Sequence, residues 1–472
     1  MGRIEFDFRF PRGRARGDVA ASRVLVIASL SGVERGVSRL HRIDVENFDD
    51  VLRALEPEVS IPGGAPQTLR FASLADFQPD ALYEVLDGIA ALRRSREQLS
   101  NPRTFEAERA RLMAAAPAED DASTLERLLG QRPAEPQPTA AKRSSFDDML
   151  RELVAPHITR GPGAAQAELM ASVDAALSDE MRRVLHTPAL QRLEASWLGV
   201  RKLVFENPLG AELEVYVLDA SREALLADLR ACAGELERSQ LYRAVVQPAL
   251  HPDGVQYSLI VSDLQCSGSE EDVSLFAGLG AVAAQAGACL LAAADPALWG
   301  ASDLSRRPER SAWSEPDPEL VRRMALLRGS AVARFIGLCG PRILGRVPYG
   351  PKAEPVERFD FVELTADPEH AAFLWLNPAF ACAQLILEGV AQHGWEDGPG
   401  TQLDLGDLPH VVKRTAAGDA LLPCAEVFLD ETGARQIMNA GVMPFLSYRN
   451  RNAVRLARLQ SIADPPAPLA LR

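Results

Sequence analysis

Short apolar segments alternate with helical segments through the middle of the chain, and this order constrains the fold more than any other feature of the sequence. Leu213–Leu218, Tyr257–Val261 and Ala288–Ala294 have the length and apolar content of buried strands. Helices are expected between them, over Ser221–Arg238 and Asp272–Gln285. Strands that alternate with helices form largely parallel sheets with helical crossovers. We therefore predict an α/β fold with mixed, largely parallel sheets flanked by helices.

The first 115 residues have the same mixed character. Val24–Leu30 is predicted to be a buried strand, Thr68–Ser73 a further strand, and Asn47–Leu55 a short helix with Asn47 as its N-cap. Pro79–Leu99 is predicted to be one long amphipathic helix. Its apolar face holds Leu82, Val85, Leu86, Ile89 and Leu92.

The chain begins with a further predicted strand. Ile4, Phe6, Phe8 and Phe10 alternate with charged residues, which is the period of a strand with one buried face. A turn-rich basic segment, residues 11–17, follows it. A terminal strand on such a tether can complete its own sheet or add to the sheet edge of another subunit. The residues alone leave both alternatives open.

A break between residues 116 and 145 divides the chain. It holds Pro117, Pro133, Pro136 and Pro138 and the acidic run 119–121, and is predicted to be a Pro/Ala-rich linker. We therefore expect one domain over residues 1–115 and a second over residues 146–472.

Composition excludes several classes of function. The chain has 472 residues, with 51 Lys and Arg against 65 Asp and Glu, so its formal net charge is −14. A nucleic-acid binder needs a basic surface, so no nucleic-acid partner is expected. The six cysteines form no C-x-x-C pair, which is typical of reduced thiols in a cytoplasmic protein. We find no secretory signal and no strongly apolar span of about 20 residues, so membrane insertion is not expected.

The sequence carries no recognisable catalytic or cofactor motif. Gly-Lys, G-x-S-x-G and H-E-x-x-H are absent, and the seven histidines are scattered. Gly278–Ala283 matches G-x-G-x-x-A, but it does not directly follow a predicted strand, so close helix packing explains it better than a dinucleotide. We therefore predict no catalytic residue, cofactor or metal. An α/β enzyme with dispersed catalytic residues is the alternative, and it would show a deep pocket with converging polar groups.

Two segments of the N-terminal part resemble a known family. They are Arg42–Leu52 (RIDVENFDDVL) and Leu69–Leu82 (LRFASLADFQPDAL). Both are similar to the small subunit (TssB/VipA-like) of the type VI secretion contractile sheath.

The part after the linker resembles the large sheath subunit (TssC/VipB-like). His186–Trp197 is similar to its signature helix, although residues 198–200 are Leu-Gly-Val where that family usually has Arg-Gly-Leu. Tyr257–Asp263 and Arg334–Gly350 follow in the family's order. Four shorter matches come after them: Phe373–Asn377, Gly394–Trp395, Ala425–Val427 and Gly441–Pro444.

The resemblance implies a small and a large sheath subunit fused in one chain, interlocked, and stacked helically around an inner tube. It implies a structural role without catalysis, in which neighbours exchange strands and Ile4–Phe10 is the exchanged strand. The Pro79–Leu99 face is expected to pack against the large-subunit-like part. Implied partners are copies of this chain, other sheath subunits, an inner tube protein, a baseplate and a recycling AAA+ ATPase.

One departure from the family bears on this role. The large subunit normally continues well past the segment matched by Gly441–Pro444, whereas this sequence stops about 30 residues later. The resemblance therefore implies that the large-subunit-like domain lacks the usual C-terminal region. A non-contractile cap, terminator or baseplate-associated adaptor that binds a sheath end is the alternative role.

Overall fold

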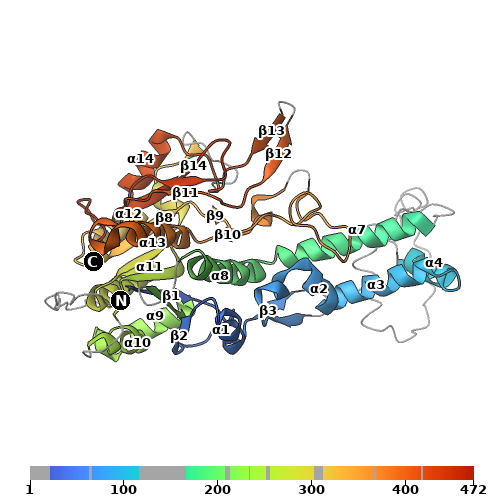
Figure 1. The fold of residues 1–472 in the computed structure, drawn as a ribbon, viewed down its shortest axis with the longest axis horizontal. Helices are drawn as coiled ribbons and strands as arrows, with labels where there is room; N and C mark the ends of the chain where they lie inside the picture. Colours follow the sequence, from blue (N-terminus) through green and yellow to red (C-terminus); the bar gives the residue numbers. More distant parts are fainter. Residues whose placement is uncertain are drawn as a thin grey trace, which may run out of the picture.

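The structure, a computed structural model, describes residues 22–471 except 63–65, 116–165, 208–212, 233, 251–255, 302–303, 305–311, 366–367 and 416–417. A broad body holds the main sheet, and an arm of long helices extends from it (Figure 1). The predicted strand with Ile4, Phe6, Phe8 and Phe10 and the predicted linker lie outside the described residues.

The body is built on a nine-stranded sheet with the order β11-β15-β14-β8-β7-β6-β1-β5-β2. The six strands from β14 to β5 run parallel, whereas β2, β15 and β11 each pair antiparallel. The prediction of a mixed, largely parallel α/β sheet is therefore confirmed. The strands are β1 Ser22–Ala28, β2 Leu40–Ile43, β5 Leu213–Asp219, β6 Leu259–Cys266, β7 Cys289–Ala294, β8 Ile336–Gly340, β11 Asp404–Leu405, β14 Val442–Ser447 and β15 Val454–Leu456.

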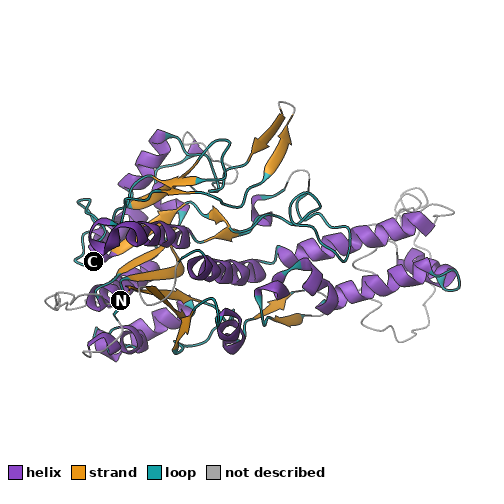
Figure 2. Cartoon of the chain, viewed as in Figure 1, coloured by secondary structure: helices purple, strands orange, loops and turns teal. Residues whose placement is uncertain are grey.

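Helices cover both faces of this sheet (Figure 2). Alternate residues of β1 show the two cores, because Val24 and Val26 belong to one apolar cluster and Leu25 and Ile27 to the other. The first core is shared with α8 (Pro188–Phe205) and α13 (Pro378–Asp397), and the second with α9, α10, α11, α12 and α14. These five span Arg222–Ala231, Gln240–Val245, Glu270–Ala286, Pro318–Arg328 and Glu431–Asn439.

Small elements complete the body. The two-stranded sheets are β3 (Glu58–Ile61) with β4 (Gln67–Arg70), β9 (Ile343–Leu344) with β10 (Trp375–Leu376), and β12 (Val412–Thr415) with β13 (Gly418–Leu421). Helix α1 (Phe48–Leu55) follows β2. Short 3-10 helices span Leu74–Phe77, Leu236–Arg238, Pro248–Leu250, Pro296–Trp299, Ala333–Phe335 and His370–Ala372.

The arm consists of α2 (Pro79–Val85), α3 (Asp87–Ser100), α4 (Phe105–Ala115) and α7 (Gln166–Leu185). The prediction of one continuous helix over Pro79–Leu99 is wrong, because Leu86 has φ −78° and ψ 123° and separates α2 from α3. This extended residue changes the direction in which the side chains of α2 point relative to those of α3. Val85 is consequently 55% exposed, although its spacing placed it on the apolar face.

Three other predicted elements differ in detail. The helix expected over Ser221–Arg238 ends at Ala231, and β4 ends at Arg70 although the strand was expected to reach Ser73. Asn47 occupies the N-cap position of α1, but its side chain accepts a hydrogen bond from the Asp44 N–H and caps no helical N–H.

Close helix packing explains the Gly278–Ala283 segment. It lies inside α11, and a Cβ on Gly278 would come within 2.7 Å of Leu229, while one on Gly280 would come within 2.6 Å of Ile336. The packing interpretation of these glycines is therefore confirmed. None of the helices in the described ranges is long and apolar enough to cross a membrane.

Candidate assembly site

The N-terminal part, residues 22–115 of the described chain, joins the remainder through the backbone of the main sheet. Strand β1 pairs in parallel with β5 along Ser22–Ala28 and with β6 along Val24–Ile27. A strand from the first part of the sequence therefore lies between two strands from the second part. Both of its edges are hydrogen-bonded, and neither is open to another strand.

Side chains also hold the loop that follows β1. The carboxylate of Asp219, 2% exposed, accepts hydrogen bonds from the N–H groups of Leu30 at 2.7 Å and Ser31 at 3.1 Å. The indole Nε1 of Trp197 donates to the Leu30 carbonyl at 2.9 Å. At the other end of β1, the Arg23 Nε lies 2.6 Å from Glu214 Oε2. The junction therefore combines backbone pairing with buried polar contacts.

A second junction lies in the arm, where four of the five predicted packing residues are buried. Leu82 is 1% exposed, Leu86 3%, and Ile89 and Leu92 are fully buried. They share one apolar cluster with four residues of α7: Leu169, Val173, Leu177 and Met181. Val85 is the exception, because the break at Leu86 turns it to the surface.

Polar contacts in the arm are more exposed. Arg96 Nε lies 2.5 Å from Asp174 Oδ1, and both side chains are 47% exposed. Such surface ion pairs contribute about 0–1 kcal/mol. The Gln166 side chain donates to the Leu99 carbonyl at 2.6 Å. Apolar burial therefore stabilises this junction more than charge does.

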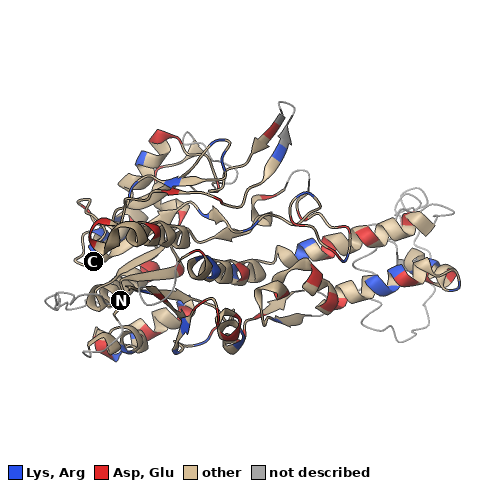
Figure 3. Ribbon diagram, in the orientation of Figure 1, with Lys and Arg blue, Asp and Glu red and all other residues tan. Residues whose placement is uncertain are grey.

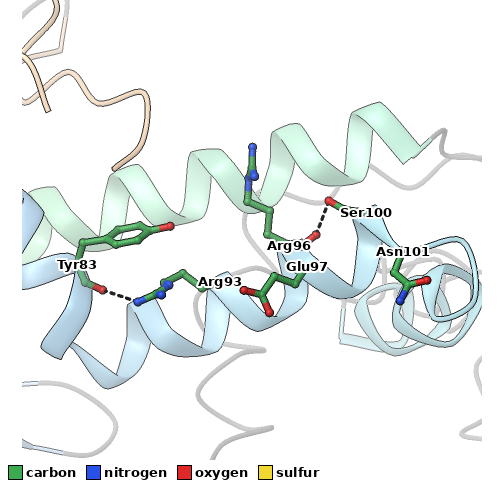
Figure 4. A pocket seen from close by; sticks show the side chains of 6 residues that line it. All are labelled: Tyr83, Arg93, Arg96, Glu97, Ser100 and Asn101. Atoms are coloured by element: carbon green, nitrogen blue, oxygen red, sulfur yellow. Dashed lines mark hydrogen bonds between the residues drawn. The ribbon is translucent and has the colours of Figure 1, made fainter. Parts of the chain in front are cut away.

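A depression on the arm has a volume of about 400 Å³ (Figure 4). Tyr83, Arg93, Arg96, Glu97, Ser100 and Asn101 line it. They follow one another along α2 and α3 and the residue after α3, and Arg93 and Ser100 donate to the backbone carbonyls of Tyr83 and Arg96. The polar groups follow one helical surface and do not converge from several elements, which is unlike a catalytic pocket.

A buried ionic cluster joins the body to the base of the arm. Arg346 lies between Glu194 of α8, at 2.7 Å, and Glu363, with contacts at 2.7 and 2.9 Å. The guanidinium also lies over the Tyr349 ring, 4.2 Å from its centroid. Glu363 Oε2 accepts a further bond from the Tyr349 N–H at 2.8 Å, and His186, after α7, has its Nε2 3.7 Å from Glu363 Oε1. The cluster therefore ties three separate segments together.

The two carboxyl groups of this cluster have opposite pKa shifts. Complete burial raises the pKa of Glu194, although Arg346 opposes that effect. Burial also acts to raise the pKa of Glu363, but the contacts with His186 and Arg346 outweigh it and lower its pKa to about 2. Both carboxylates raise the pKa of Arg346 despite its burial. The arginine is therefore a permanent charge, and removing it would leave Glu363 buried without its main partner.

A similar pair fixes the segment after β8. The Arg342 guanidinium lies 2.6 Å from Glu426 Oε1, the Arg342 N–H donates to Glu426 Oε2 at 2.8 Å, and His370 Nε2 lies 3.2 Å from Glu426 Oε1. Burial acts to raise the pKa of Glu426, but His370 and Arg342 outweigh it and the pKa is lowered. These contacts hold the segment after β8 against the segment that contains Glu426.

Asp263, the last residue of the Tyr257–Asp263 segment, lies at an irregularity of β6 where the pairing with β7 shifts register. Its carboxylate accepts a hydrogen bond from Ser196 of α8. Complete burial raises the pKa of Asp263 to about 6, against the hydrogen bonds from Ser196 and Asn377. Ser196 lies on α8 and Asp263 on β6, so this hydrogen bond joins a helix to a strand.

The buried polar side chains described above form hydrogen bonds and ion pairs that join separate segments of the chain. Among the described residues, no three or more His, Cys, Asp or Glu side chains are grouped to hold a metal ion. Residues 167–463 match the family model described as "EvpB/VC_A0108, tail sheath N-terminal domain". The match covers more than half of the chain, so this chain belongs to that tail sheath family.

A curated relative agrees with this family. The chain is 27% identical over 315 residues to the type VI secretion system sheath protein TssC1 of Pseudomonas aeruginosa PAO1. The aligned region is 63% of this chain and 61% of the relative. The chain thus spans about three fifths of the length of that relative, and the large-subunit part of the predicted resemblance is supported by both comparisons.

Sequence reasoning missed the buried charges. Glu194, Arg346 and Arg342 lie inside the segments that resemble the large subunit, but the paired residues are far apart in the sequence. Arg346 pairs with Glu363, 17 residues away, and with Glu194, 152 residues away, and Arg342 pairs with Glu426, 84 residues away. The signal in the sequence that could have predicted these buried charges is a carboxylate or an arginine within an otherwise apolar segment. It indicates a buried charge, but it does not identify the partner.

Proposed function

We propose that this chain is a structural, non-catalytic protomer of a type VI secretion sheath or sheath-like assembly, with a small-subunit-like part (1–115) and a large-subunit-like part (146–472) fused through a linker (116–145). One observation carries the proposal: β1 of the N-terminal part lies between β5 and β6 of the family-matched region. The family-matched region therefore needs the N-terminal part to complete its sheet. Fusion gives that partner a high effective concentration and a fixed one-to-one ratio.

The assembly proposal concerns contacts between copies. In it, the strand with Ile4, Phe6, Phe8 and Phe10 adds to the sheet of a neighbouring copy, and copies stack helically around an inner tube protein in the cytoplasm. Its alternating pattern supports this role, because β-strand addition uses backbone hydrogen bonds together with alternate side chains. A baseplate and a recycling AAA+ ATPase are further proposed partners.

A second candidate is a cap, terminator or baseplate-associated adaptor that binds a sheath end. Co-expression with separate sheath subunits distinguishes the two roles: an adaptor would be found at tube ends, and a protomer along the whole tube.

Negative-stain electron microscopy over a range of protein concentrations tests the main proposal. We expect the purified chain to form tubes or rings, and Phe6→Asp with Phe8→Asp to abolish them while circular dichroism and the melting temperature stay the same. The matched control is Val85→Asp with Val362→Asp, which adds the same charge at positions 55% and 47% exposed. Assembly that survives the Phe6 and Phe8 changes would exclude strand addition, and monomers of the unaltered chain at every concentration would favour the adaptor.

A further inference from the structure

One turn of the sheet presents several arginines in an acidic protein. The connection from β14 to β15 and the strand after it, residues 448–458, hold Arg449, Arg451, Arg455 and Arg458 and no carboxylate; we call it the arginine turn. All four arginines are exposed. The whole chain has a formal charge of −14, so this segment departs from the average charge of the surface.

The arginine turn is held in place by contacts that leave most of its charge unpaired. The Tyr448 hydroxyl donates to Asp404 Oδ1 at 2.5 Å, and Arg455 lies 2.7 Å from Asp404 Oδ2. The guanidinium of Arg449 lies 5.0 Å from the Phe428 ring centroid, and that of Arg451 lies 5.1 Å from the Tyr448 centroid. Stacking on aromatic rings restrains a guanidinium and leaves its N–H donors available.

The available donors indicate a carboxylate-bearing partner. No carboxylate among the described residues forms an ion pair with Arg449, Arg451 or Arg458, whereas the arm carries residues of both charges (Figure 3). Arginine binds carboxylates through two parallel hydrogen bonds and is enriched where protein interfaces are strongest. A nucleic acid is disfavoured because the remainder of this acidic surface would repel its phosphates.

A matching surface lies at the other side of the same sheet. Residues 44–50, between β2 and the first turn of α1, hold Asp44, Glu46, Asp49 and Asp50 and no Lys or Arg; we call it the acidic corner. Glu46 and Asp49 are exposed and form no ion pair with any described residue. Asp50 is paired with Arg53 at 2.8 Å. Val45, between them, is 53% exposed.

The two surfaces lie diagonally across the sheet (Figure 1). β2 is one edge strand, and its antiparallel register with β5 places residue 44 near the amino end of β5. β14 is parallel to β8 and lies two strands from the opposite edge, so the turn after Ser447 lies at the carboxyl ends. Complementary surfaces on opposite sides of one molecule form head-to-tail contacts, which build rings or open filaments.

We propose that the arginine turn of one copy docks on the acidic corner of the next copy. The proposal rests on the proposed function, because it requires that copies of this chain assemble. It adds an electrostatic contact that is independent of the strand at Ile4–Phe10. Docking of this kind is weakened by salt and depends on opposite charge at the two surfaces.

The test exchanges charges between the two surfaces of the full chain. One variant carries Arg449→Glu with Arg451→Glu, and the other Glu46→Arg with Asp49→Arg. We expect each variant alone to associate at least about tenfold more weakly than the unaltered chain in sedimentation velocity at low salt. Mixed in equal amounts, the two variants should assemble again as alternating copies, because each then meets a neighbour of opposite charge. The matched control, Arg103→Glu with Arg192→Glu, has the same change in net charge as the first variant and should associate normally.

The outcomes separate this contact from the proposed function. Equal association of the unaltered chain and of both variants would overturn the docking contact while leaving sheath-type assembly standing. Failure of the mixture to assemble, with both variants folded by circular dichroism, would also overturn it. Failure of the unaltered chain to associate at any salt or protein concentration would overturn the contact together with the assembly proposal.

Discussion

The two junctions between the N-terminal part and the remainder of the chain differ in what holds them. In the body, β1 is hydrogen-bonded on both sides and its Val24–Ala28 side chains are at most 1% exposed. In the arm, α3 lies along α7 through an apolar stripe and the half-exposed Arg96–Asp174 pair. In the body, the backbone N–H and C=O groups of β1 find their hydrogen-bond partners in β5 and β6. In the arm, the backbone groups of a helix are paired within that helix. The body therefore needs both parts of the chain to complete its sheet, whereas the arm needs both parts only to bury its apolar side chains.

The strongest test of this difference is a charge inside β1. Val26→Asp places a carboxylate at a fully buried position between β5 and β6. We expect a loss of more than about 5 kcal/mol, enough to unfold body and arm together, because Val26 shares one core cluster with the arm residues. Thermal unfolding followed by circular dichroism measures it. Val85→Asp is the control, and a cooperative transition of unchanged midpoint in the Val26 variant would contradict the expectation.

The next effect concerns the cluster that joins body and arm. Arg346→Ala leaves Glu194 and Glu363 buried without their guanidinium, and should lower the free energy of unfolding by about 4 kcal/mol in urea titrations. Adding Glu194→Gln and Glu363→Gln to the same variant should recover part of the loss, because the uncompensated charges are then removed. A triple variant no more stable than Arg346→Ala would show that packing, and not charge, holds this joint.

A smaller and more local effect is expected in the arm. Leu92→Ala removes a fully buried side chain of α3 and should cost about 3 kcal/mol. Hydrogen exchange should increase in α3 and α7 while β1, β5 and β6 keep their protection. Val85→Ala, at an exposed position, should change stability by no more than about 0.5 kcal/mol. Loss of protection in β1 as well would mean that arm and body unfold as one unit.

The smallest expected effect is the pH dependence of stability that Asp263 causes in the body. The pKa of Asp263 is about 6 in the folded chain, against 3.8 as its ordinary value. Between those pH values the folded state keeps a proton that the unfolded state has lost, so the contribution of Asp263 to stability falls as the pH rises from about 4 to about 6. Relative to the unaltered chain, Asp263→Asn should therefore gain between about 2 and 3 kcal/mol over that range.

The difference in unfolding free energy between Asp263→Asn and the unaltered chain isolates the contribution of Asp263. Glu363 and Glu426 have lowered pKa values, so their contributions are present above the ordinary glutamate pKa and lost as the pH falls. They are common to both chains and cancel. A constant difference between Asp263→Asn and the unaltered chain from pH 4 to pH 7 would contradict the assigned pKa.

Local patterns determined which elements form. The apolar segments predicted the strands now seen as β1, β5 and β7 to within two residues and the first part of β6, and helical periodicity predicted α1 and α11. These predictions succeed because strand and helix periods are read from neighbouring residues, and the same patterns supported mixed α/β layers. The segments similar to the large sheath subunit lie in the region that the family model matches.

Only the tertiary structure decided which elements meet. Nothing local in Ser22–Ala28 says that it lies between β5 and β6, about 190 and 235 residues away, because parallel partners are chosen by long-range packing. The extended Leu86 interrupts a continuous helical pattern where α2 and α3 change direction, and it exposes Val85. The pairing of Arg346 with the buried Glu194 and Glu363 likewise depends on the tertiary structure. The sequence by itself determined most of the elements and their apolar faces. Strand partners, the break at Leu86 and the buried ion pairs were decided only by the tertiary structure, because burial and charge pairing depend on distances in space.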